Sequence, residues 1–384
     1  MNLFAFDDAS CRALADQHGT PLFAYHGPTV EAQYSLLRAV LPARARVAYA
    51  VKANPHPQLL SRLAALGAAF DCASLGELRR VAALQVGSGR LFYAGPGKRD
   101  EELQAALQMG VRIQAEGWED LARIEAFSDG PVEVNLRVHP AKGVEESSRI
   151  IGGVGPSAFG VDEEQLPEIL ARVAALKRVR IGGLHVFAAS NERSAGRLLA
   201  THAMVLELGR ELTRRFGLEL AQIDVGGGLG VPYGPDQLPL DVEALGLGLR
   251  DLLGTHSWFS GELLLEPGRF LSAPCGVYLA RVVRVKESRG VRFAILEGGL
   301  NHLLRPLLTG EPFPVRAVGK GGAALRTTLA GPLCTSLDRL GEVDLPDLYP
   351  DDLLAFGMTG AYGCTEGMTH FLSHPPAKEV WVEG

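Results

Sequence analysis

The chain has 384 residues, of which 47% are hydrophobic and 21% charged, a composition typical of a globular protein with a sizeable core. Its formal net charge of -6 argues against nucleic acid as the main partner, because phosphate binding needs a basic surface. The first residues, MNLFAFDDASC, do not resemble a secretory signal, and no run of about 18 apolar residues predicts a membrane span.

The cysteines are scattered along the chain, five in number, and none forms a C-x-x-C pair. This usage suits a reducing cytoplasm, where we expect the protein to be located, and argues against a disulfide framework. His370 and His374 have helical i, i+4 spacing but lack the H-E-x-x-H pattern, so no metal site is predicted.

Between residues 47 and 268, short apolar runs alternate with segments of helical period. The runs are rich in β-branched and aromatic residues and short enough for buried parallel strands. There are eight, at residues 47–53, 68–74, 90–95, 111–116, 132–138, 182–187, 222–228 and 263–268. Amphipathic helices are predicted between them, for example at 101–110 and 195–216, and Ser74 with Glu77 matches a capping box.

Eight strand–helix repeats in series are the pattern of a (β/α)8 TIM barrel. An open, doubly wound sheet is the alternative, but eight consecutive units favour closure. After Arg269 the pattern changes to strands separated by turns, at 276–288, 291–299, 352–357 and 379–384. We therefore predict a barrel domain over residues 25–268. A β-rich barrel or sandwich domain is predicted over 269–384 together with 1–24, completed by a strand at Leu3–Phe6.

Polar and glycine residues recur where the predicted barrel strands end. Taken singly, each has an ordinary explanation as a rim residue or a tight turn. Barrel enzymes place catalysis at the carboxyl ends of their strands, so the set as a whole predicts a central polar site. Its members are Lys52, Asp71, Arg137, His185, Gly226, Gly227, Gly228 and Glu266.

The residue types in this set favour one cofactor. Lys52 has apolar neighbours, which favour the neutral amine that imine formation needs. The glycine-rich turn after Asp224 could cradle a phosphate with its backbone N–H groups. It is not a dinucleotide motif, because Val231 replaces the last glycine, and Gly95–Lys98 is not a P-loop, because Arg99 follows it. An imine-forming lysine, a phosphate cradle and a buried acid together predict pyridoxal phosphate (PLP).

Six motifs resemble those of the fold-type III PLP decarboxylases, the family of the diaminopimelate and ornithine decarboxylases. They are Tyr49-Ala-Val-Lys52-Ala-Asn-Pro, Phe70-Asp-Cys-Ala-Ser74, Asp224-Val-Gly-Gly-Gly228, Glu266-Pro-Gly-Arg269, Gly331-Pro-Leu-Cys334 and Gly360-Ala-Tyr362-Gly. The resemblance spans nearly the whole chain in the right order. It implies a barrel plus a β-domain, and a head-to-tail homodimer with two shared active sites.

The resemblance also implies roles for individual residues. Lys52 would hold the cofactor as a Schiff base, and Glu266 would face the pyridine nitrogen and keep the ring protonated as an electron sink. Cys334 of the partner subunit would be the proton donor, although a small buried hydrophobe is its ordinary role. Asp71 and Arg137 would support the cofactor and its lysine. The phosphate would be held by Gly226, Gly227, Gly228, Ser190, Arg269 and Tyr362.

The chain departs from the family at two places. Phe187 stands where the family has a histidine stacked on the cofactor ring, and His185 is then assigned to the O3′ side of the cofactor or to the substrate. Thr335 follows Cys334, where the family has an acid for the substrate's distal ammonium, whereas Arg305, which contacts a distal carboxylate in diaminopimelate enzymes, is retained. This combination predicts a substrate whose distal end is an anion, an amide or a thioester.

Three further motifs look closer to a specialised subgroup of the family, at residues 155–160, 331–338 and 371–375. The subgroup includes the carrier-protein-linked glutamyl decarboxylase of aminoglycoside synthesis and the decarboxylases associated with exosortase systems. We therefore expect a specialised decarboxylase, with a diaminopimelate decarboxylase of lysine biosynthesis as the alternative. Three other possibilities stay open: a PLP racemase, disfavoured by Glu266; a non-catalytic PLP-binding protein; and a barrel hydrolase using Asp71 and Glu266.

Overall fold

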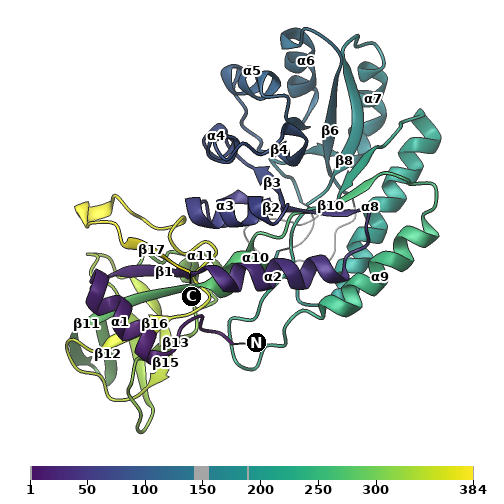
Figure 1. Ribbon diagram of the computed structural model, residues 1–384. Helices are drawn as coiled ribbons and strands as arrows, with labels where there is room; N and C mark the ends of the chain where they lie inside the picture. The colour runs from purple at the N-terminus through teal and green to yellow at the C-terminus, as the bar shows by residue number, and fades with distance from the viewer. Residues whose placement is uncertain (1, 142–154, 188–189, 384) are drawn as a thin grey trace. The chain divides into compact units, whose positions relative to one another are not determined.

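The computed structural model describes residues 2–141, 155–187 and 190–383, which divide into two compact units (Figure 1). The barrel unit consists of Tyr34–Gly230 and Leu240–Gly268. The β unit consists of Met1–Gln33, Val231–Pro239 and Arg269–Gly384. The short internal segment Val231–Pro239 therefore belongs with the two ends of the sequence.

The barrel unit is built on eight parallel strands that close into a ring, as the eight apolar runs predict. In spatial order they are β5 (Arg112–Ala115), β4 (Leu91–Tyr93), β3 (Ala69–Cys72), β2 (Ala45–Ala50), β10 (Glu262–Leu265), β9 (Gln222–Asp224), β8 (Val179–His185) and β6 (Val132–His139). Pairing of β5 with β6 closes the ring, and the short β7 (Val161–Asp162) lies beside β6. The (β/α)8 barrel is confirmed.

Helices follow most of these strands and surround the ring (Figure 1). They are α3 (Pro57–Ala65), α4 (Leu75–Ala82), α5 (Asp100–Gln108), α6 (Trp118–Phe127), α7 (Leu166–Val173), α8 (Ala195–Phe216) and α9 (Val242–Thr255), whereas α2 (Gly27–Val40) is divided between the two units. The α4 N-cap forms as predicted, since the Ser74 hydroxyl accepts from the Glu77 backbone N–H at 3.2 Å. Leu75, Leu78 and Val81 then repeat at the spacing that buries one helical face.

The interior of the ring is filled by apolar side chains from different strands. Ala48, Ala69, Phe92 and Leu264 form one buried cluster, each no more than 2% exposed. Small residues on β2 and β3 make room for the larger ones on β4 and β10, so the barrel is a packed core and not a pore. Burying each of the two large side chains contributes about 1.5–3 kcal/mol.

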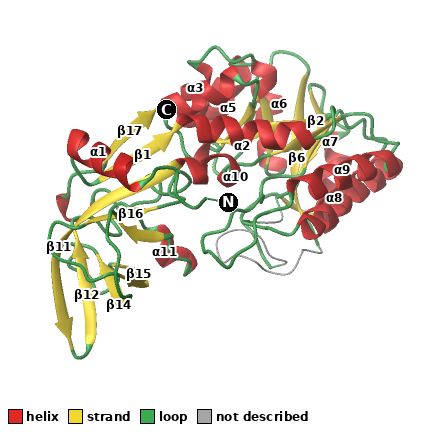
Figure 2. Cartoon of the chain, turned by 60° about the horizontal axis from the view of Figure 1, so that its bottom comes forward, coloured by secondary structure: helices red, strands yellow, loops and turns green. Residues whose placement is uncertain are grey.

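The β unit is a mostly antiparallel sheet with few helices (Figure 2). Its path runs β13 (Val315–Ala317), β16 (Leu353–Phe356), β11 (Gly276–Ser288), β12 (Val291–Leu296), β14 (Leu325–Ala330) and β15 (Arg339–Leu345). Off this path, β1 (Leu22–His26) pairs with β11 and with β17 (Lys378–Val382). Its helices α1, α10 and α11 cover Asp8–His18, Arg269–Ser272 and Arg305–Thr309.

The prediction that Leu3–Phe6 supplies the N-terminal strand is wrong, because Leu22–His26 takes that place. Asp7 caps α1 by accepting from the Ser10 backbone N–H at 2.8 Å, so the chain turns into a helix directly after Phe6. The phenyl ring of Phe6 nevertheless packs into the apolar core beneath β1 and β11. The segment contributes a side chain to this core but no strand.

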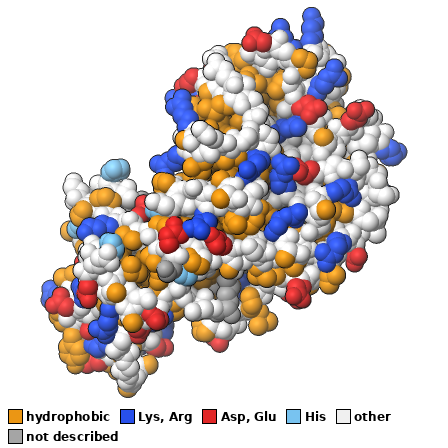
Figure 3. All heavy atoms as spheres, in the orientation of Figure 1, with side chains coloured by type: hydrophobic (Ala, Val, Ile, Leu, Met, Phe, Trp, Pro, Cys, Tyr) orange, Lys and Arg blue, Asp and Glu red, His pale blue; other side chains and the backbone are white. Residues whose placement is uncertain are grey.

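The surface in Figure 3 carries acidic and basic side chains interspersed with apolar ones. This mixture agrees with the small net charge of -6. Among the residues that the structure describes, no helix has the length and apolar character needed to cross a membrane.

Candidate active site

Predicted polar residues of the barrel meet at the carboxyl ends of its strands. Lys52, in the turn after β2, places its amine 3.3 Å from the Asp71 carboxylate on β3. His185, at the end of β8, places Nε2 3.6 Å from Oε2 of Glu266, which follows β10. The Lys52 side chain is one-third exposed, whereas the other three are at most 2% exposed. A buried cluster of charges therefore surrounds one accessible amine.

Glu266 forms a buried acid pair with Asp224, the last residue of β9. Gln114 joins them, because its amide nitrogen donates to Asp224 at 2.9 Å and to Glu266 at 3.3 Å. Burial opposes ionisation of Glu266, but His185 and Lys52 outweigh it and hold its pKa well below the usual range. Burial and the nearby Glu266 raise the pKa of Asp224 well above its usual range. The surroundings therefore favour ionisation of Glu266 over ionisation of Asp224.

Two buried side chains near the amine have polar atoms without a hydrogen-bond partner in the described part of the chain. They are both ring nitrogens of His185 and Oδ1 of Asp71. Buried polar atoms are rarely left unpaired in folded proteins, so each indicates a place where a polar ligand could bind. One ligand atom from each of His185, Asp224 and Glu266 also lies within 4.8 Å of the others, a spacing that could hold a metal ion.

The glycine-rich turn after β9 has a conformation that requires glycine. Gly226 and Gly228 have φ angles of 71° and 97°, in the left-handed region. A Cβ atom added at Gly227 would lie 2.6 Å from the carbonyl oxygen of Glu266. The Gly226 N–H donates to Asp224, which ties this turn to the acid pair. The motif therefore brings backbone close to the cluster of charges, where a phosphate could accept N–H bonds.

Arg137 lies on β6 and is 9% exposed. It donates to Glu116 at 2.9 Å and covers the ring of Phe159, with 4.7 Å from the guanidinium carbon to the ring centre. Glu116 also accepts from the Gly160 backbone N–H at 2.7 Å. Asp71 thus contacts the Lys52 amine directly, whereas Arg137 belongs to a neighbouring network with Glu116.

Phe187 follows β8 and faces the same amine. The Lys52 nitrogen lies 5.7 Å from the centre of the Phe187 ring. Ser190, three residues further on, is partly buried. The aromatic ring and the acid pair thus both contribute to the surroundings of Lys52.

In the β unit, two arginines flank Tyr362. The guanidinium carbons of Arg269 and Arg305 each lie 4.9 Å from the Tyr362 ring centre. Arg269 also donates to the Tyr233 hydroxyl at 2.8 Å, and Arg305 lies 3.4 Å from the Glu366 carboxylate. The backbone φ of Tyr362 is 58°, an unusual value for a residue with a side chain, and such strain is concentrated at functional sites.

Cys334 and Thr335 lie on a loop of the β unit that Asp338 holds in place. The Asp338 carboxylate accepts from the backbone N–H groups of Leu300 and Leu333, both at 2.7 Å. Cys334 itself is exposed and Thr335 is half-buried. The Asp338 carboxylate therefore fixes the loop while the thiol points to its surface.

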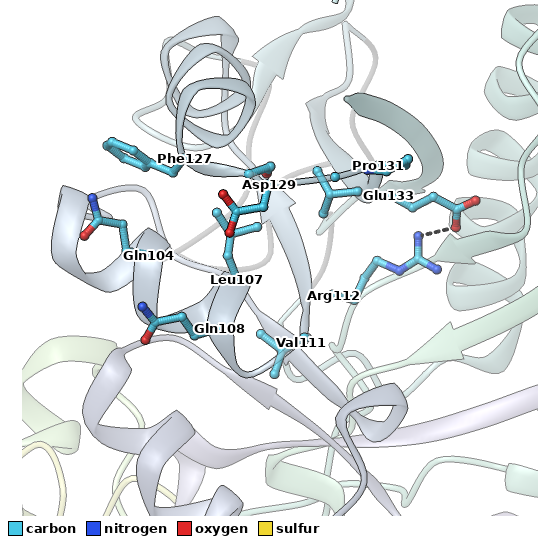
Figure 4. A pocket seen from close by; sticks show the side chains of 13 residues that line it. Gln104, Leu107, Gln108, Val111, Arg112, Phe127, Asp129, Pro131 and Glu133 are labelled. Carbon is cyan, nitrogen blue, oxygen red and sulfur yellow. Dashed lines mark hydrogen bonds and ion pairs between the residues drawn. The ribbon is translucent and has the colours of Figure 1, made fainter. Parts of the chain in front are cut away.

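A different hollow lies at the opposite, amino ends of β5 and β6 (Figure 4). It has a volume of about 630 Å³ and is lined by the ends of α5 and α6. Its ion pair, Arg112 with Glu133 at 3.0 Å, is partly exposed. It lacks the buried charges found at the carboxyl ends of the strands, so we place the chemistry at the carboxyl ends.

Sequence reasoning missed several residues of these clusters. Gln114 and Glu116 end the strand 111–116, so the rule that singled out the other strand ends would also have found them. Tyr233 and Glu366 lie in loops without regular spacing, and no signal in the sequence distinguishes them.

The chain matches the family described as "Pyridoxal-dependent decarboxylase, pyridoxal binding domain" over residues 28–273. It is 32% identical to the L-glutamyl-(BtrI acyl-carrier protein) decarboxylase of Niallia circulans, covering 99% of this chain and 92% of that protein. It is 33% identical to the diaminopimelate decarboxylase of Deinococcus radiodurans, covering 96% of this chain and 92% of that protein.

The fold is also similar to a crystal structure of diaminopimelate decarboxylase from Helicobacter pylori complexed with L-lysine. The TM-score is 0.89 at 25% identity, over 97% of this chain and 94% of that one. The similarity therefore includes the β unit as well as the barrel.

Proposed function

The chain belongs to the pyridoxal-dependent decarboxylases, and from this premise we propose that its substrate is an amino acid with a neutral carbonyl group at the distal end, such as an amide or a carrier-bound thioester. The chain is thus a carboxy-lyase that uses pyridoxal phosphate. The observation that carries the proposed substrate class is the pairing of Arg305 with Glu366. Family membership excludes the barrel hydrolase.

The buried side chains of the barrel fit the cofactor. We propose that the Lys52 amine attaches it, that Glu266 offers an anion to its ring nitrogen, and that Phe187 offers a ring face. The unpaired atoms of His185 and Asp71 supply polar contacts at the same strand ends. When bound, pyridoxal phosphate takes up the negative charge that remains after CO₂ leaves the substrate.

We propose that the backbone of Gly226, Gly227 and Gly228 holds the phosphate. The motif resemblance adds three side chains to this proposed phosphate site, those of Ser190, Arg269 and Tyr362. The conformation of the turn supports the first group, because Gly226 and Gly228 are left-handed and Gly227 has no room for a side chain, so that bare backbone lies at the strand ends. The buried Arg269 keeps a full positive charge, since its neighbours Tyr233, Tyr362 and Glu366 counteract burial and raise its pKa.

Cys334 is the proposed proton donor to the substrate carbon. Its thiol is exposed in the single chain, and Leu337 on the same loop is 58% exposed. A partner subunit would cover such a loop, which supports the proposed homodimer in which Cys334 serves the site of the other chain.

The distal end of the substrate is proposed to meet Arg305 and Thr335. Arg305 is 7% exposed, and its Nη1 lies 3.4 and 3.5 Å from the two oxygens of Glu366. A substrate carboxylate at this guanidinium would be repelled by Glu366, whereas a neutral carbonyl oxygen could accept an N–H without a second negative charge. Thr335 adds no charge. The Niallia relative, which is named for a carrier-linked glutamyl substrate, agrees with this assignment.

A second candidate is meso-diaminopimelate, because Arg305 and Glu366 could together receive the carboxylate and the ammonium of its distal end. The Deinococcus relative is named for this activity. The sequence reasoning assumed that no acid lies near the distal end of the substrate, because Thr335 stands where the family has one. Glu366 corrects this premise, since its carboxylate lies beside Arg305.

Release of CO₂ from matched substrates separates the two candidates. We expect the γ-methylamide of L-glutamate and carrier-linked glutamate to be turned over faster than L-glutamate, and ornithine and lysine weakly. Glu366→Gln should reduce the preference for the methylamide over glutamate by about tenfold, since the repulsion is removed. Glu311→Gln is the matched control, because Glu311 pairs with Gln237 in the same unit and not with Arg305.

Loss of meso-diaminopimelate turnover in Glu366→Gln would support the second candidate instead. Rapid turnover of ornithine or lysine would contradict the interpretation of Thr335. If no substrate releases CO₂, borohydride reduction and mass spectrometry of Lys52 still report whether the cofactor is attached there.

A further inference from the structure

We propose that Asp338 is a positioning residue for Cys334: its buried carboxylate holds the donor segment (331–338), which carries the thiol, against the neighbouring turn (299–303), which precedes Arg305. This role rests on the proposed function, in which Cys334 donates the proton to the substrate carbon. It adds what keeps the thiol in place for that transfer.

The Asp338 carboxylate uses both of its oxygens to join the two segments. Oδ2 accepts from the Leu333 backbone N–H in the donor segment, and Oδ1 accepts from the Leu300 N–H in the neighbouring turn, both at 2.7 Å. Asp338 is 3% exposed, so these bonds are shielded from water. An asparagine at this position would offer one oxygen and one N–H₂ group, and the latter cannot accept a hydrogen bond. An acid is therefore the side chain that satisfies both N–H groups.

The donor segment is closed by backbone bonds around Cys334. The Thr335 N–H donates to the Leu333 carbonyl oxygen at 2.8 Å, and the Gly331 N–H donates to the Asp338 carbonyl oxygen at 3.1 Å. Cys334 is thus the middle residue of a tight turn whose first residue is bonded to the Asp338 carboxylate. Its thiol is exposed in the single chain, so the backbone of the segment sets its position, and not packing around the side chain.

The neighbouring turn is closed by backbone bonds as well. The His302 and Leu303 N–H groups donate to the Gly299 carbonyl oxygen at 2.9 and 2.8 Å. The chain then continues into α11, which begins at Arg305. Asp338 therefore connects the proposed proton donor with the segment that leads to the arginine proposed for the distal end of the substrate.

Two glycines allow the segments to lie this close. A Cβ atom added at Gly299 or at Gly331 would overlap the Asp338 carboxylate, and one added at Gly299 would lie 2.6 Å from the Gly331 Cα. Neither residue has a left-handed φ, so backbone conformation does not require glycine at either position. The close approach of the two segments and of the acid does require it.

Hydrogen exchange of the full-length protein without cofactor tests whether Asp338 joins the segments. In Asp338→Asn we expect the Leu300 or the Leu333 backbone N–H to exchange about tenfold faster, measured by mass spectrometry, since one of them loses its acceptor. Gly299→Ala keeps the acid but displaces it, so it should have the same effect and serves if Asp338→Asn fails to fold.

Turnover in a double-mutant cycle tests whether Asp338 acts through Cys334. A displacement of about 1 Å can slow a positioned group by about a hundredfold, so we expect Asp338→Asn to lower kcat about tenfold to a hundredfold with the Lys52 adduct retained. In the Cys334→Ala background the same change should lower kcat less than about twofold, because the donor is already absent. Loss of the fold or of a dimer would instead slow both backgrounds alike.

Asp352→Asn is the matched control in both experiments. The Asp352 carboxylate also accepts a backbone N–H, that of Tyr349 at 2.7 Å, but at another turn of the β unit. We expect this variant to leave the exchange of Leu300 and Leu333 and the value of kcat unchanged.

Unchanged exchange of both N–H groups in Asp338→Asn and Gly299→Ala would overturn the inference. So would a loss of kcat of equal size in the two backgrounds, or a similar loss in Asp352→Asn. Failure of the proposed function would look different, since the unmodified protein would then release no CO₂ and carry no reducible adduct on Lys52, while the exchange rates would still decide whether Asp338 joins the two segments.

Discussion

The barrel unit and the β unit hold their charged side chains in different ways. In the barrel, Asp71, His185, Asp224 and Glu266 are at most 2% exposed and lie at the ends of neighbouring strands. In the β unit, Arg269 and Arg305 are each 7% exposed, but the Glu366 side chain beside Arg305 is 25% exposed and Cys334 is exposed, both on loops.

This difference suggests a division of work. Buried groups at low dielectric are strongly coupled, so a change at one alters the charge of the others. Partly exposed loop residues can change without disturbing such a network. We therefore assign attachment of the cofactor to the barrel residues, and proton donation and the choice of substrate to the β unit, and four predictions test this assignment.

The largest effect is expected for Lys52→Ala in the barrel. Without the amine there is no covalent attachment of the cofactor, and we expect CO₂ release to fall by more than about a thousandfold. Mass spectrometry after borohydride treatment should find no adduct. Retained colour and turnover in this variant would remove Lys52 from the mechanism.

Cys334→Ala tests the β unit in the same assay. Loss of a proton donor should slow turnover by about a hundredfold, while the reducible adduct on Lys52 remains. Cys364→Ala is a control in the same unit, since this thiol is half-buried and its pKa is raised by burial. Normal turnover in Cys334→Ala would assign protonation to another group.

We expect the free energy of unfolding to depend on pH through the buried His202 and not through the exposed His370. His202 is buried in α8, and burial lowers its pKa from 6.5 to about 4. Between these values the unfolded chain binds more protons than the folded one, so stability rises with pH and is lost as the pH falls from 6.5 to 4. The loss amounts to about 3 kcal/mol.

Urea unfolding at pH 4.5 and pH 7 measures this loss. His202→Leu should reduce the difference between the two pH values, because the Nδ1 atom it removes has no hydrogen-bond partner in the described residues. His370→Gln, at an exposed position of the β unit, should leave it unchanged. If both variants changed the difference in unfolding free energy between pH 4.5 and pH 7 equally, burial of His202 would not be the cause of the pH dependence.

The smallest effect is expected for Arg112→Gln at the amino ends of the barrel strands. Its partly exposed ion pair with Glu133 contributes less than about 1 kcal/mol, and it lies in the hollow of Figure 4, away from the acid pair. We expect CO₂ release to change by less than about twofold. A large loss of activity would mean that this end of the barrel also takes part in catalysis.

Much of the fold was predictable because its signals are local. Eight short apolar runs became the eight barrel strands, and Ser74 capped α4 as its spacing indicates. Leu3–Phe6 shows the limit of such signals: its apolar pattern suits a strand, but Asp7 starts a helix directly after it and Leu22–His26 pairs instead. Whether a segment pairs as a β-strand depends on which other strand lies next to it in the fold, and the residue pattern alone does not predict this.

The sequence by itself determined the barrel, the strand ends that carry polar residues, and the family motifs. Only the tertiary structure decided that Gln114 bridges Asp224, 110 residues away, and Glu266, 152 residues away, and that Glu366 lies beside Arg305. The charge of each acid depends on burial and on neighbours brought together by closure of the ring. That is why the charges of these acids follow from the folded chain and not from the residue pattern.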